Sequence, residues 1–240
     1  MPKKTNKDKC EIEQELKISL SPNDLEKLFK ALKKKAIGKK IEHKYMPRAY
    51  YDTPDLRLYQ NSISLRMQYK PGKNGKIGGY EQTVKFDLPP GDMPHSKSLA
   101  KGVFLRKECK DMIHFHAPQL AKIKDRQCRA AVKPFNNKKM VHIFTAAIER
   151  RAFHLRVGRG KKRGLIEVAF DVGSIILGSD RKHYPFYEVE LEVKGGSAET
   201  IDIARDKIKK IARSARVQPL SKAQQGSRLY RRRVGKNKIF

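Results

Sequence analysis

The feature that most restricts the fold of this chain is a period of two in the order of apolar and ionic side chains. In residues 11–20, EIEQELKISL, apolar side chains occupy one parity, and Glu13, Glu15 and Lys17 occupy the other. Successive side chains of a β-strand point to opposite faces of its sheet. The segment therefore predicts a strand with one apolar face and one ionic face.

The same alternation recurs along the chain and predicts a mainly β structure with a few helices (α+β). We expect further strands at residues 63–69, 80–86, 103–109, 148–157, 165–171 and 187–194. Apolar residues at helical spacing predict amphipathic helices over residues 21–35 and 197–215. A third helix is expected over residues 111–124, interrupted near Pro118, and a short one from Ser221.

Two of the predicted strands carry carboxylates at alternate positions. Glu13 and Glu15 form one such set, and Glu188, Glu190 and Glu192 form the other. Neighbours on the same face of a strand lie roughly 6.5–7 Å apart, given the rise per residue. Clustered carboxylates repel each other unless water or a cation separates them, and Mg²⁺ or Mn²⁺ is the natural bridge for oxygen ligands.

Basic residues are distributed about one to a strand, on the same faces as these acids. If the sheet closes into a barrel, the basic side chains converge on its axis and form a receptacle for a chain of phosphates. The apolar faces would then point outward and need the amphipathic helices as cover. A half-exposed antiparallel sheet would show the same charged faces, so alternation alone leaves both arrangements open.

The overall charge also points to an anionic partner. The chain has 55 Lys and Arg against 25 Asp and Glu, a net charge of +30. Such an excess of positive charge favours binding to nucleic acid, to acidic lipid or to a phosphate-rich small molecule. Part of it lies in the chain ends, where it is either solvated surface or a means of non-specific polyanion binding by basic tails.

The expected location is cytoplasmic. No apolar run approaches the roughly 20 residues that cross a bilayer, and the first ten residues lack the apolar core of a secretory signal, so no membrane association is expected. Cys10, Cys109 and Cys128 lie far apart in the sequence without a CxxC pair. We interpret this spacing as evidence against a zinc cluster or a disulfide framework, and as typical of a reducing cytoplasm.

Several segments together resemble the CYTH superfamily, the triphosphate tunnel metalloenzymes. The residues 13–17, EQELK, match the ExExK motif, although many charged strands would match it too. The more specific similarities are YDTPDLRL at 51–58, SLR at 64–66, QTVK at 82–85, RKE at 106–108, ER at 149–150, IEVAFD at 166–171, EVELE at 188–192 and SKA at 221–223. These segments follow in the order of the family, and they resemble most strongly its bacterial inorganic triphosphatases.

The resemblance implies a closed antiparallel β-barrel of about eight strands that forms a charged tunnel, with amphipathic helices packed outside. It implies a CYTH domain over residues 11–230, between a basic N-terminal tail at 1–10 and a basic C-terminal tail at 231–240. One departure is Gln68, which follows Arg66 and Met67 where many members have R-x-R, so that one phosphate contact is missing.

The resemblance also implies an assignment of site residues and cofactors. Mg²⁺ or Mn²⁺ would be held by Glu13, Glu15, Glu188 and Glu190. The substrate would be bound by Lys17, Arg66, Lys85, Arg106, Arg150 and Lys222. The catalytic groups would be Glu13, Glu15, Lys17 and Lys85, and the supporting groups would be Glu108, Glu167 and Asp171.

The predicted activity is divalent-metal-dependent hydrolysis of inorganic triphosphate to diphosphate and phosphate, which makes the partner a triphosphate-containing small molecule. Two alternatives use the same tunnel: a class IV adenylyl cyclase, and a thiamine or nucleoside triphosphatase. An alternative of another class is a non-catalytic module that binds polyphosphate or RNA. Converging carboxylates favour the enzyme, because a pure polyanion binder has no use for them. Nothing in the sequence specifies an oligomeric state.

Overall fold

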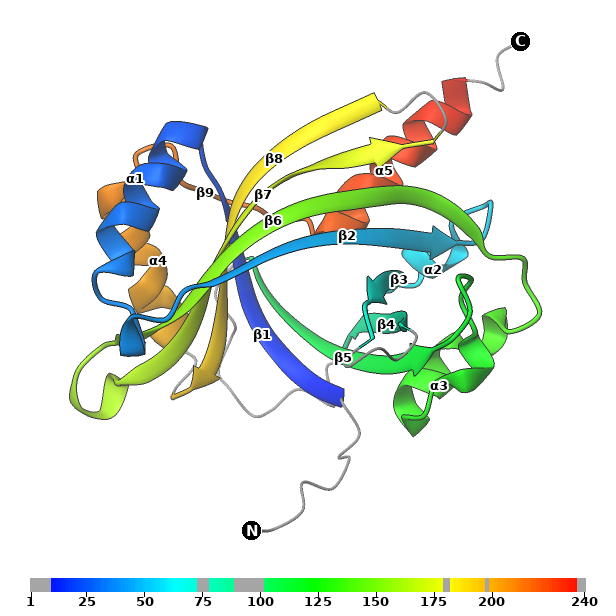
Figure 1. The fold of residues 1–240 in the computed structure, drawn as a ribbon, viewed down its shortest axis with the longest axis horizontal. Helices are drawn as coiled ribbons and strands as arrows, with labels where there is room; N and C mark the ends of the chain where they lie inside the picture. The colour runs from blue at the N-terminus through cyan, green and yellow to red at the C-terminus, as the bar shows by residue number, and fades with distance from the viewer. Residues whose placement is uncertain (1–9, 73–77, 89–101, 179–181, 197–198, 237–240) are drawn as a thin grey trace.

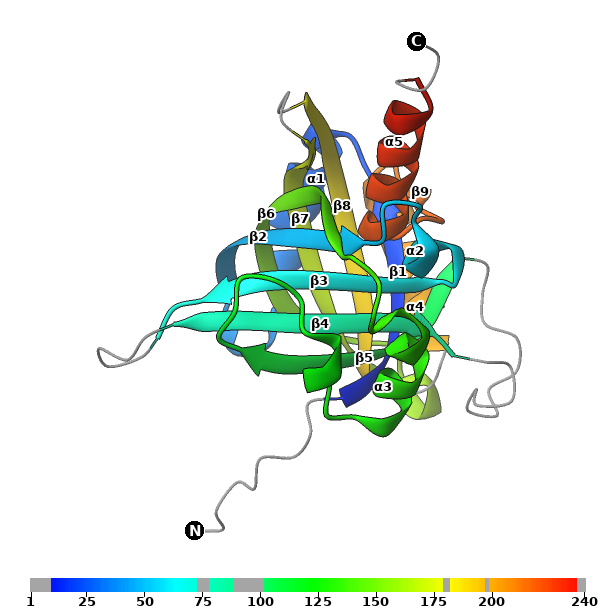
Figure 2. The same ribbon diagram turned by 90° about the vertical axis from the view of Figure 1, so that its right-hand side faces the viewer.

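Eight strands close into an antiparallel barrel in the computed structural model, which describes residues 10–72, 78–88, 102–178, 182–196 and 199–236 (Figures 1 and 2). The strands are β1 (Cys10–Ser19), β2 (Glu42–Asp52), β3 (Ile63–Lys70), β4 (Gly79–Asp87), β5 (Val103–Ile113), β6 (Val141–Val157), β7 (Gly164–Leu177) and β8 (Lys182–Gly195). Their order is β5-β4-β3-β2-β6-β7-β8-β1, and pairing of β1 with β5 closes the ring. A ninth strand, β9 (Arg216–Val217), pairs with β1 outside the barrel. The predicted fold class is confirmed.

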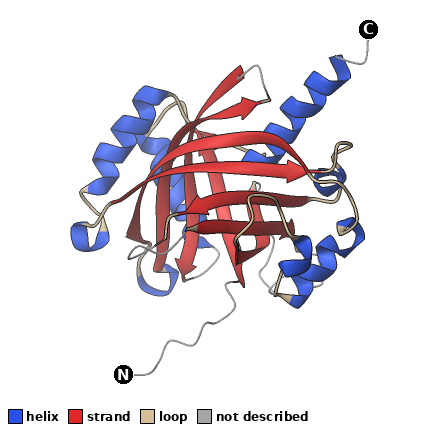
Figure 3. Ribbon diagram, turned by 45° about the vertical axis from the view of Figure 1, so that its right-hand side comes forward, coloured by secondary structure: helices blue, strands red, loops and turns tan. Residues whose placement is uncertain are grey.

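The apolar faces of the strands point outward, where helices cover them. Leu16 and Ile18 of β1 join a cluster with α1 (Pro22–Lys33) and α4 (Glu199–Ile211). Both helices lie together on one side of the barrel (Figures 1 and 3). The Ser21 side chain caps α1 by accepting a hydrogen bond from the backbone N–H of Asp24, at 3.3 Å. The two predicted amphipathic helices are therefore present and cover the barrel as expected.

Two further apolar clusters cover the rest of the outer surface. The long helix α5 (Lys222–Lys236) packs against β6 and β7, and Gly226 permits a close approach, because a Cβ there would lie 2.3 Å from the ring of Phe144. On another side, α3 (Arg126–Val132) covers β4 and β5. The short elements are α2 (Arg57–Gln60) and the 3₁₀ turns η1 (Ile37–Lys39), η3 (Leu120–Lys122), η4 (Lys133–Phe135) and η5 (Gly160–Lys162).

The helix expected over residues 111–124 is wrong. Strand β5 continues to Ile113, since Asp111 pairs with Gln82 and Ile113 with Tyr80 across β4. Sheet pairing at this position overrides the local helical pattern. The helix of this region begins later, where the Asp125 carboxylate accepts a 2.8 Å hydrogen bond from the backbone N–H of Cys128.

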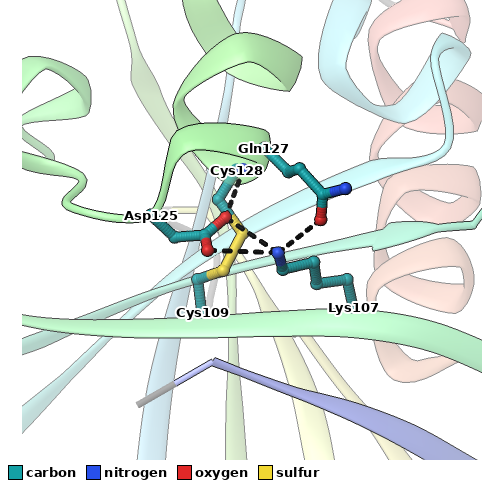
Figure 4. Close-up of a disulfide and its surroundings, with 5 residues drawn as sticks. All are labelled: Lys107, Cys109, Asp125, Gln127 and Cys128. Atoms are coloured by element: carbon teal, nitrogen blue, oxygen red, sulfur yellow. Dashed lines mark hydrogen bonds and ion pairs between the residues drawn. A yellow bond between two sulfur atoms is a disulfide. The ribbon is translucent and has the colours of Figure 1, made fainter. Parts of the chain in front are cut away.

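The interpretation of the cysteine spacing as evidence against a disulfide is also wrong. Cys109 of β5 and Cys128 of α3 form a disulfide with a Cα–Cα distance of 6.6 Å (Figure 4). Cys10 of β1 is the register partner of Cys109 in the closing strand pair. Packing of α3 on the outer face of β5 brings these residues together, and spacing along the sequence does not report it.

The segment around YDTPDLRL forms a rigid turn at the end of β2. The buried Asp52 carboxylate accepts hydrogen bonds from the backbone N–H groups of Thr53, Leu58 and Tyr59 at 2.7, 2.8 and 2.9 Å. These bonds hold Leu56 in a left-handed conformation (φ 60°) and its side chain in the apolar cluster beside α5. The segment is structural support rather than part of the tunnel.

The substitution Asp52→Ala is expected to destabilise the protein by about 2–4 kcal/mol, because three buried N–H groups lose their acceptor. Urea unfolding followed by circular dichroism would measure the change. Asp55→Ala, in the same turn but exposed and paired with Arg57, is the control and should shift the midpoint much less. Equal shifts for both variants would contradict the structural role of Asp52.

Candidate active site inside the barrel

A polar cavity of about 370 Å³ occupies the interior of the barrel. Every barrel strand and α5 contribute ionic side chains to its lining, and most of these side chains are buried or half-buried. The central ones are Glu13, Glu15, Lys17, Arg48, Arg66, Lys85, Arg106, Glu108, Arg150, Glu167, Glu190 and Lys222. The barrel interior is therefore ionic and the exterior apolar, as the alternation of the strands requires.

The acids of β1 and β8 meet around two lysines. The Lys17 ammonium contacts both Glu15, at 3.1 Å from Oε2, and Glu190. The Lys222 ammonium, at the start of α5, lies 2.7 Å from Glu190 Oε1. Burial alone would raise the pKa of Glu190, but Lys17, Lys222 and Arg150 hold that pKa well below its usual range. Glu190 is thus ionised throughout the physiological pH range.

Two carboxylates that lie outside the cavity lining orient the basic groups. Asp171 accepts a bidentate pair from Arg150, at 2.6 Å to Nε and 2.7 Å to Nη2, and also binds Lys222 Nζ at 2.8 Å. Glu188 binds Lys222 Nζ at 2.9 Å and the Gln225 amide at 2.8 Å. Both carboxylates are almost completely buried, at 0% and 1% exposure. They act as anchors that aim Arg150 and Lys222 at the cavity.

A second ionic group lies on the β1, β4 and β5 side. Lys85 Nζ is 2.5 Å from Glu13 Oε2 and 2.9 Å from Glu108 Oε2, and Arg66 Nη2 is 2.8 Å from Glu108 Oε1. Burial and the neighbouring Glu108 raise the pKa of Glu13 to about 8, against the effect of Lys85. Lys85 and Arg66 lower the pKa of Glu108 in spite of its burial. The pair therefore retains a proton on Glu13 near neutral pH, hydrogen-bonded to Glu108.

In contrast to the raised pKa of Glu13, the pKa of Glu15 is lowered. Burial alone would raise its pKa, but Lys17, Arg106 and Lys85 lower it to about 2. Arg106 Nη2 lies 2.5 Å from Glu15 Oε1, and its guanidinium stacks on Phe104 at 4.3 Å from the ring centre. Two residues apart on β1, Glu13 and Glu15 thus differ in protonation. One is poised to exchange a proton and the other is a permanent anion.

The donor set is compatible with a hard divalent cation. Glu11, Glu13 and Glu108 each present a carboxylate oxygen, and these oxygens lie within 4.8 Å of one another. Glu15 and Glu190 share the ammonium of Lys17 nearby. All candidate ligands offer oxygen, which suits Mg²⁺ or Mn²⁺. Of the four predicted ligands, Glu13, Glu15 and Glu190 line the cavity, whereas Glu188 lies behind Lys222.

The remaining predicted residues also have defined positions. Lys17, Arg66, Lys85, Arg106, Arg150 and Lys222 all line the cavity, and the supporting Glu108 lies among them. Glu167 of β7 lines the cavity too, half-buried and 3.7 Å from His154. The structure thus brings together predicted side chains that are up to 209 residues apart, from Glu13 to Lys222.

Sequence reasoning missed the contribution of β2, above all Arg48. The Arg48 side chain lines the cavity, and its buried Nε has no hydrogen-bond partner among the residues that the structure describes. Burial and the neighbouring Arg66 and Arg150 lower its pKa to about 10. Arg48 and Gln68 both adjoin the Ala49–Met67 pair of β2 and β3, so Arg48 supplies a cation where Gln68 replaces the expected arginine. The alternation Glu42, Lys44, Met46, Arg48, Tyr50 is the signal that would have revealed this strand.

Comparison with known proteins gives the family. The model of the CYTH domain matches residues 11–227. The chain belongs to the CYTH domain family. The match covers all eight barrel strands and the first part of α5, so the resemblance seen in the sequence is confirmed.

Solved structures share the fold of this CYTH domain at low sequence identity. A candidate adenylate cyclase from Bacillus halodurans is 21% identical, with a TM-score of 0.55 over 90% of this chain and 97% of its own. A candidate adenylyl cyclase from Hippeastrum, described as having a dominant triphosphatase activity, is 17% identical, with a TM-score of 0.56 over 91% and 95%. No curated protein sequence matches the chain. Within the described residues, no helix is long and apolar enough to cross a bilayer.

The raised pKa of Glu13 makes the stability of the metal-free protein depend on pH. Since that pKa is about 8 in the folded protein against 4.5 for the free side chain, the contribution of neutral Glu13 is complete below pH 4.5 and is lost as the pH rises to 8. Glu13→Gln mimics the neutral form. Urea unfolding in chelator should show similar stabilities for wild type and variant at pH 5 and a more stable variant at pH 8. A difference that stays constant over this range would contradict the assignment.

Proposed function

We propose that this CYTH domain hydrolyses inorganic triphosphate to diphosphate and phosphate with Mg²⁺ or Mn²⁺ as cofactor. The observation that carries the proposal is the convergence of basic side chains and a set of carboxylates on one cavity inside the barrel. The central basic residues are Lys17, Arg48, Arg66, Lys85, Arg106, Arg150 and Lys222. Family membership makes action on a phosphoanhydride the expected chemistry, and the composition of the cavity favours the triphosphate group itself as the part that is recognised.

Charge supports this choice of substrate. A triphosphate carries about four to five negative charges, and Lys and Arg bind such oxygens through charge-assisted hydrogen bonds. In the structure the basic groups bind carboxylates of the protein. A bound substrate would replace some of these carboxylates with its phosphate oxygens. Asp171 remains as an anchor behind Arg150, and Glu108, in the cavity lining, stays paired with Arg66 and Lys85, which keeps those donors oriented.

The carboxylates of the cavity supply the other half of the chemistry. Glu13, Glu15 and Glu190 would hold the cation, with Glu11 and Glu108 beside them. When bound, the cation neutralises phosphate oxygens and lowers the pKa of water. The Glu13 carboxyl would lose its proton where a cation is bound, since a nearby positive charge favours the ionised form, and it would then orient the attacking water and accept its proton. Lys17 and Lys85 stabilise the charge that develops as the bridging oxygen leaves.

A cyclase is the second candidate, because both solved structures cited above are described as candidate adenylyl cyclases. Cyclisation of ATP requires a pocket for the base and ribose. The cavity is lined almost entirely by ionic groups, with Met46, Tyr50 and Ala223 as its apolar residues. This lining favours hydrolysis of the triphosphate over recognition of a nucleoside. Incubation with ATP separates the two by product, cyclic AMP or orthophosphate.

Binding without catalysis remains the alternative of another class. Residues 1–9 and 237–240 of the predicted basic tails lie outside the described residues, whereas 231–236 are the end of α5; these basic ends would attract polyanions non-specifically at low salt. That attraction would weaken steeply with salt and would persist after loss of the cavity carboxylates. A cytoplasmic location is part of the proposal.

Glu13→Ala and Glu190→Ala are each expected to lower kcat for tripolyphosphate by about 100-fold or more, because each removes an oxygen donor at the centre of the site. Phosphate release measured with Mg²⁺, with Mn²⁺ and with chelator would test this. Glu26→Gln, on the exposed face of α1, is the control and should keep the wild-type rate. Full activity in both alanine variants, or undiminished activity in chelator, would refute the proposed site.

Arg48→Ala is expected to raise KM for tripolyphosphate roughly tenfold with a smaller change in kcat, since it removes one phosphate donor while leaving the carboxylates in place. Steady-state kinetics at saturating metal would measure both constants. Arg57→Ala, which removes an exposed arginine paired with Asp55, serves as the matched control. An unchanged KM in Arg48→Ala would show that this guanidinium does not contact the substrate.

A further inference from the structure

All three cysteines of the chain lie together on the outer surface of the barrel. Cys10 belongs to β1, Cys109 is its register partner on β5, and Cys128 lies in the first turn of α3. With Asp125, the residue that caps α3, they offer three sulfur atoms and one carboxylate oxygen, all within 4.8 Å of one another. Figure 4 shows Asp125 directed at the Cys109–Cys128 pair.

This group has the composition of a tetrahedral zinc site. Structural zinc takes four ligands, prefers thiolates and accepts a carboxylate. With a Zn–S bond of about 2.3 Å, tetrahedral sulfur ligands lie roughly 3.8 Å apart. The four ligand atoms already lie within 4.8 Å of one another, so once the sulfur–sulfur bond is broken, rotation of side chains is sufficient to form the site. Cys109 and Cys128 are fully buried and Cys10 is partly buried, which limits competition from water.

The neighbouring polar groups suit a metal centre. Asp125 accepts a backbone hydrogen bond from Cys128 at 2.8 Å, and Lys107 Nζ lies 3.0 Å from Asp125 Oδ1 and 2.5 Å from Gln127 Oε1. These bonds fix the carboxylate in position. Three thiolates and one carboxylate around a divalent ion leave a formal charge of −2, which the Lys107 ammonium partly offsets. The disulfide itself uses neither Cys10 nor Asp125.

The geometry points to a zinc site of Cys10, Cys109, Cys128 and Asp125 that forms when the Cys109–Cys128 disulfide is reduced. A thiol reductant transfers two electrons and two protons to the disulfide, leaves two thiols and is itself oxidised to a disulfide. Zinc then displaces one proton from each of the three thiols. Exchange with a small-molecule disulfide, which takes up the two electrons and leaves as two thiols, joins Cys109 and Cys128 again, removes two ligands and releases the metal. The structure therefore shows the oxidised form of a redox-dependent site.

The location gives this site a mechanical role. It would link β1, β5 and α3, which are the closing strand pair of the barrel and the helix over its outer face. Cys109 faces outward, whereas the adjacent Glu108 faces the cavity. The proposal does not depend on the activity proposed for the cavity, since its four ligands lie on the other side of the barrel wall.

Cobalt titration of the full-length chain tests the proposal directly. The protein is reduced with a phosphine, freed of metal and titrated with Co²⁺. Because every cysteine of the chain belongs to the cluster, a thiolate-to-cobalt charge-transfer band can arise only there. We expect this band to saturate at one Co²⁺ per chain, to be abolished by one equivalent of Zn²⁺, and to disappear on oxidation. Zinc should also protect three thiols from alkylation and raise the melting temperature of the wild type.

Variants separate this site from the cavity. Cys10→Ser, at a partly exposed position, should raise the cobalt concentration at half-saturation at least about tenfold, and Asp125→Asn should weaken binding less. Glu13→Gln and Glu190→Gln, which alter the cavity, should leave the band unchanged. A reduced, folded wild type that gives no charge-transfer band, or whose three thiols react equally fast with and without zinc, would overturn the proposal whether or not the variants fold.

Discussion

The structure depends on one electrostatic constraint: a charge taken out of water must find a partner of opposite sign. The barrel interior holds acids and bases from every strand, and the described groups at its centre bind one another. Asp171, at 0% exposure, is tolerable only because Arg150 and Lys222 bind it. An interior of this kind excludes an apolar core inside the barrel. The apolar faces must therefore point outward, and α1, α3, α4 and α5 are the helices that shield them.

The same constraint explains how the basic groups of the cavity are held in position. Asp171 and Glu188 lie behind the basic groups, while Glu13, Glu15, Glu108 and Glu190 lie beside them in the cavity. Lys17 and Lys85 neutralise acids that a divalent cation would bind in the proposed function, which would free both ammonium groups for phosphate oxygens. The contrast between Glu13, with a pKa near 8, and Glu15, with a pKa near 2, arises from unequal numbers of cationic neighbours. Two similar side chains on one strand thereby acquire different chemistry.

Much of this arrangement could be predicted from the sequence, because a period of two determines which side chains share a face. The positions of Glu13, Glu15, Lys85 and Arg106 follow from that rule once the barrel closes. Which inward-facing side chains reach the cavity could not be predicted. Glu188 and Glu190 lie on the same face of β8, but Lys222 separates Glu188 from the cavity. Pro47 and the irregularity at Tyr50/Tyr51 interrupt the pattern of β2, which concealed Arg48. The cysteine cluster depends on how α3 packs against β5, and no local pattern reports such a contact.

The central claim, that the interior of the barrel binds triphosphate beside a divalent cation, is tested most directly by a crystal structure of the full chain with Mn²⁺ and imidotriphosphate, a slowly hydrolysed analogue. Our account predicts anomalous density for manganese between carboxylates of β1 and β8, with analogue oxygens within hydrogen-bond distance of Arg66, Arg150 and Lys222. Analogue bound only to lysines on the outer surface, with the interior ion pairs undisturbed, would contradict it.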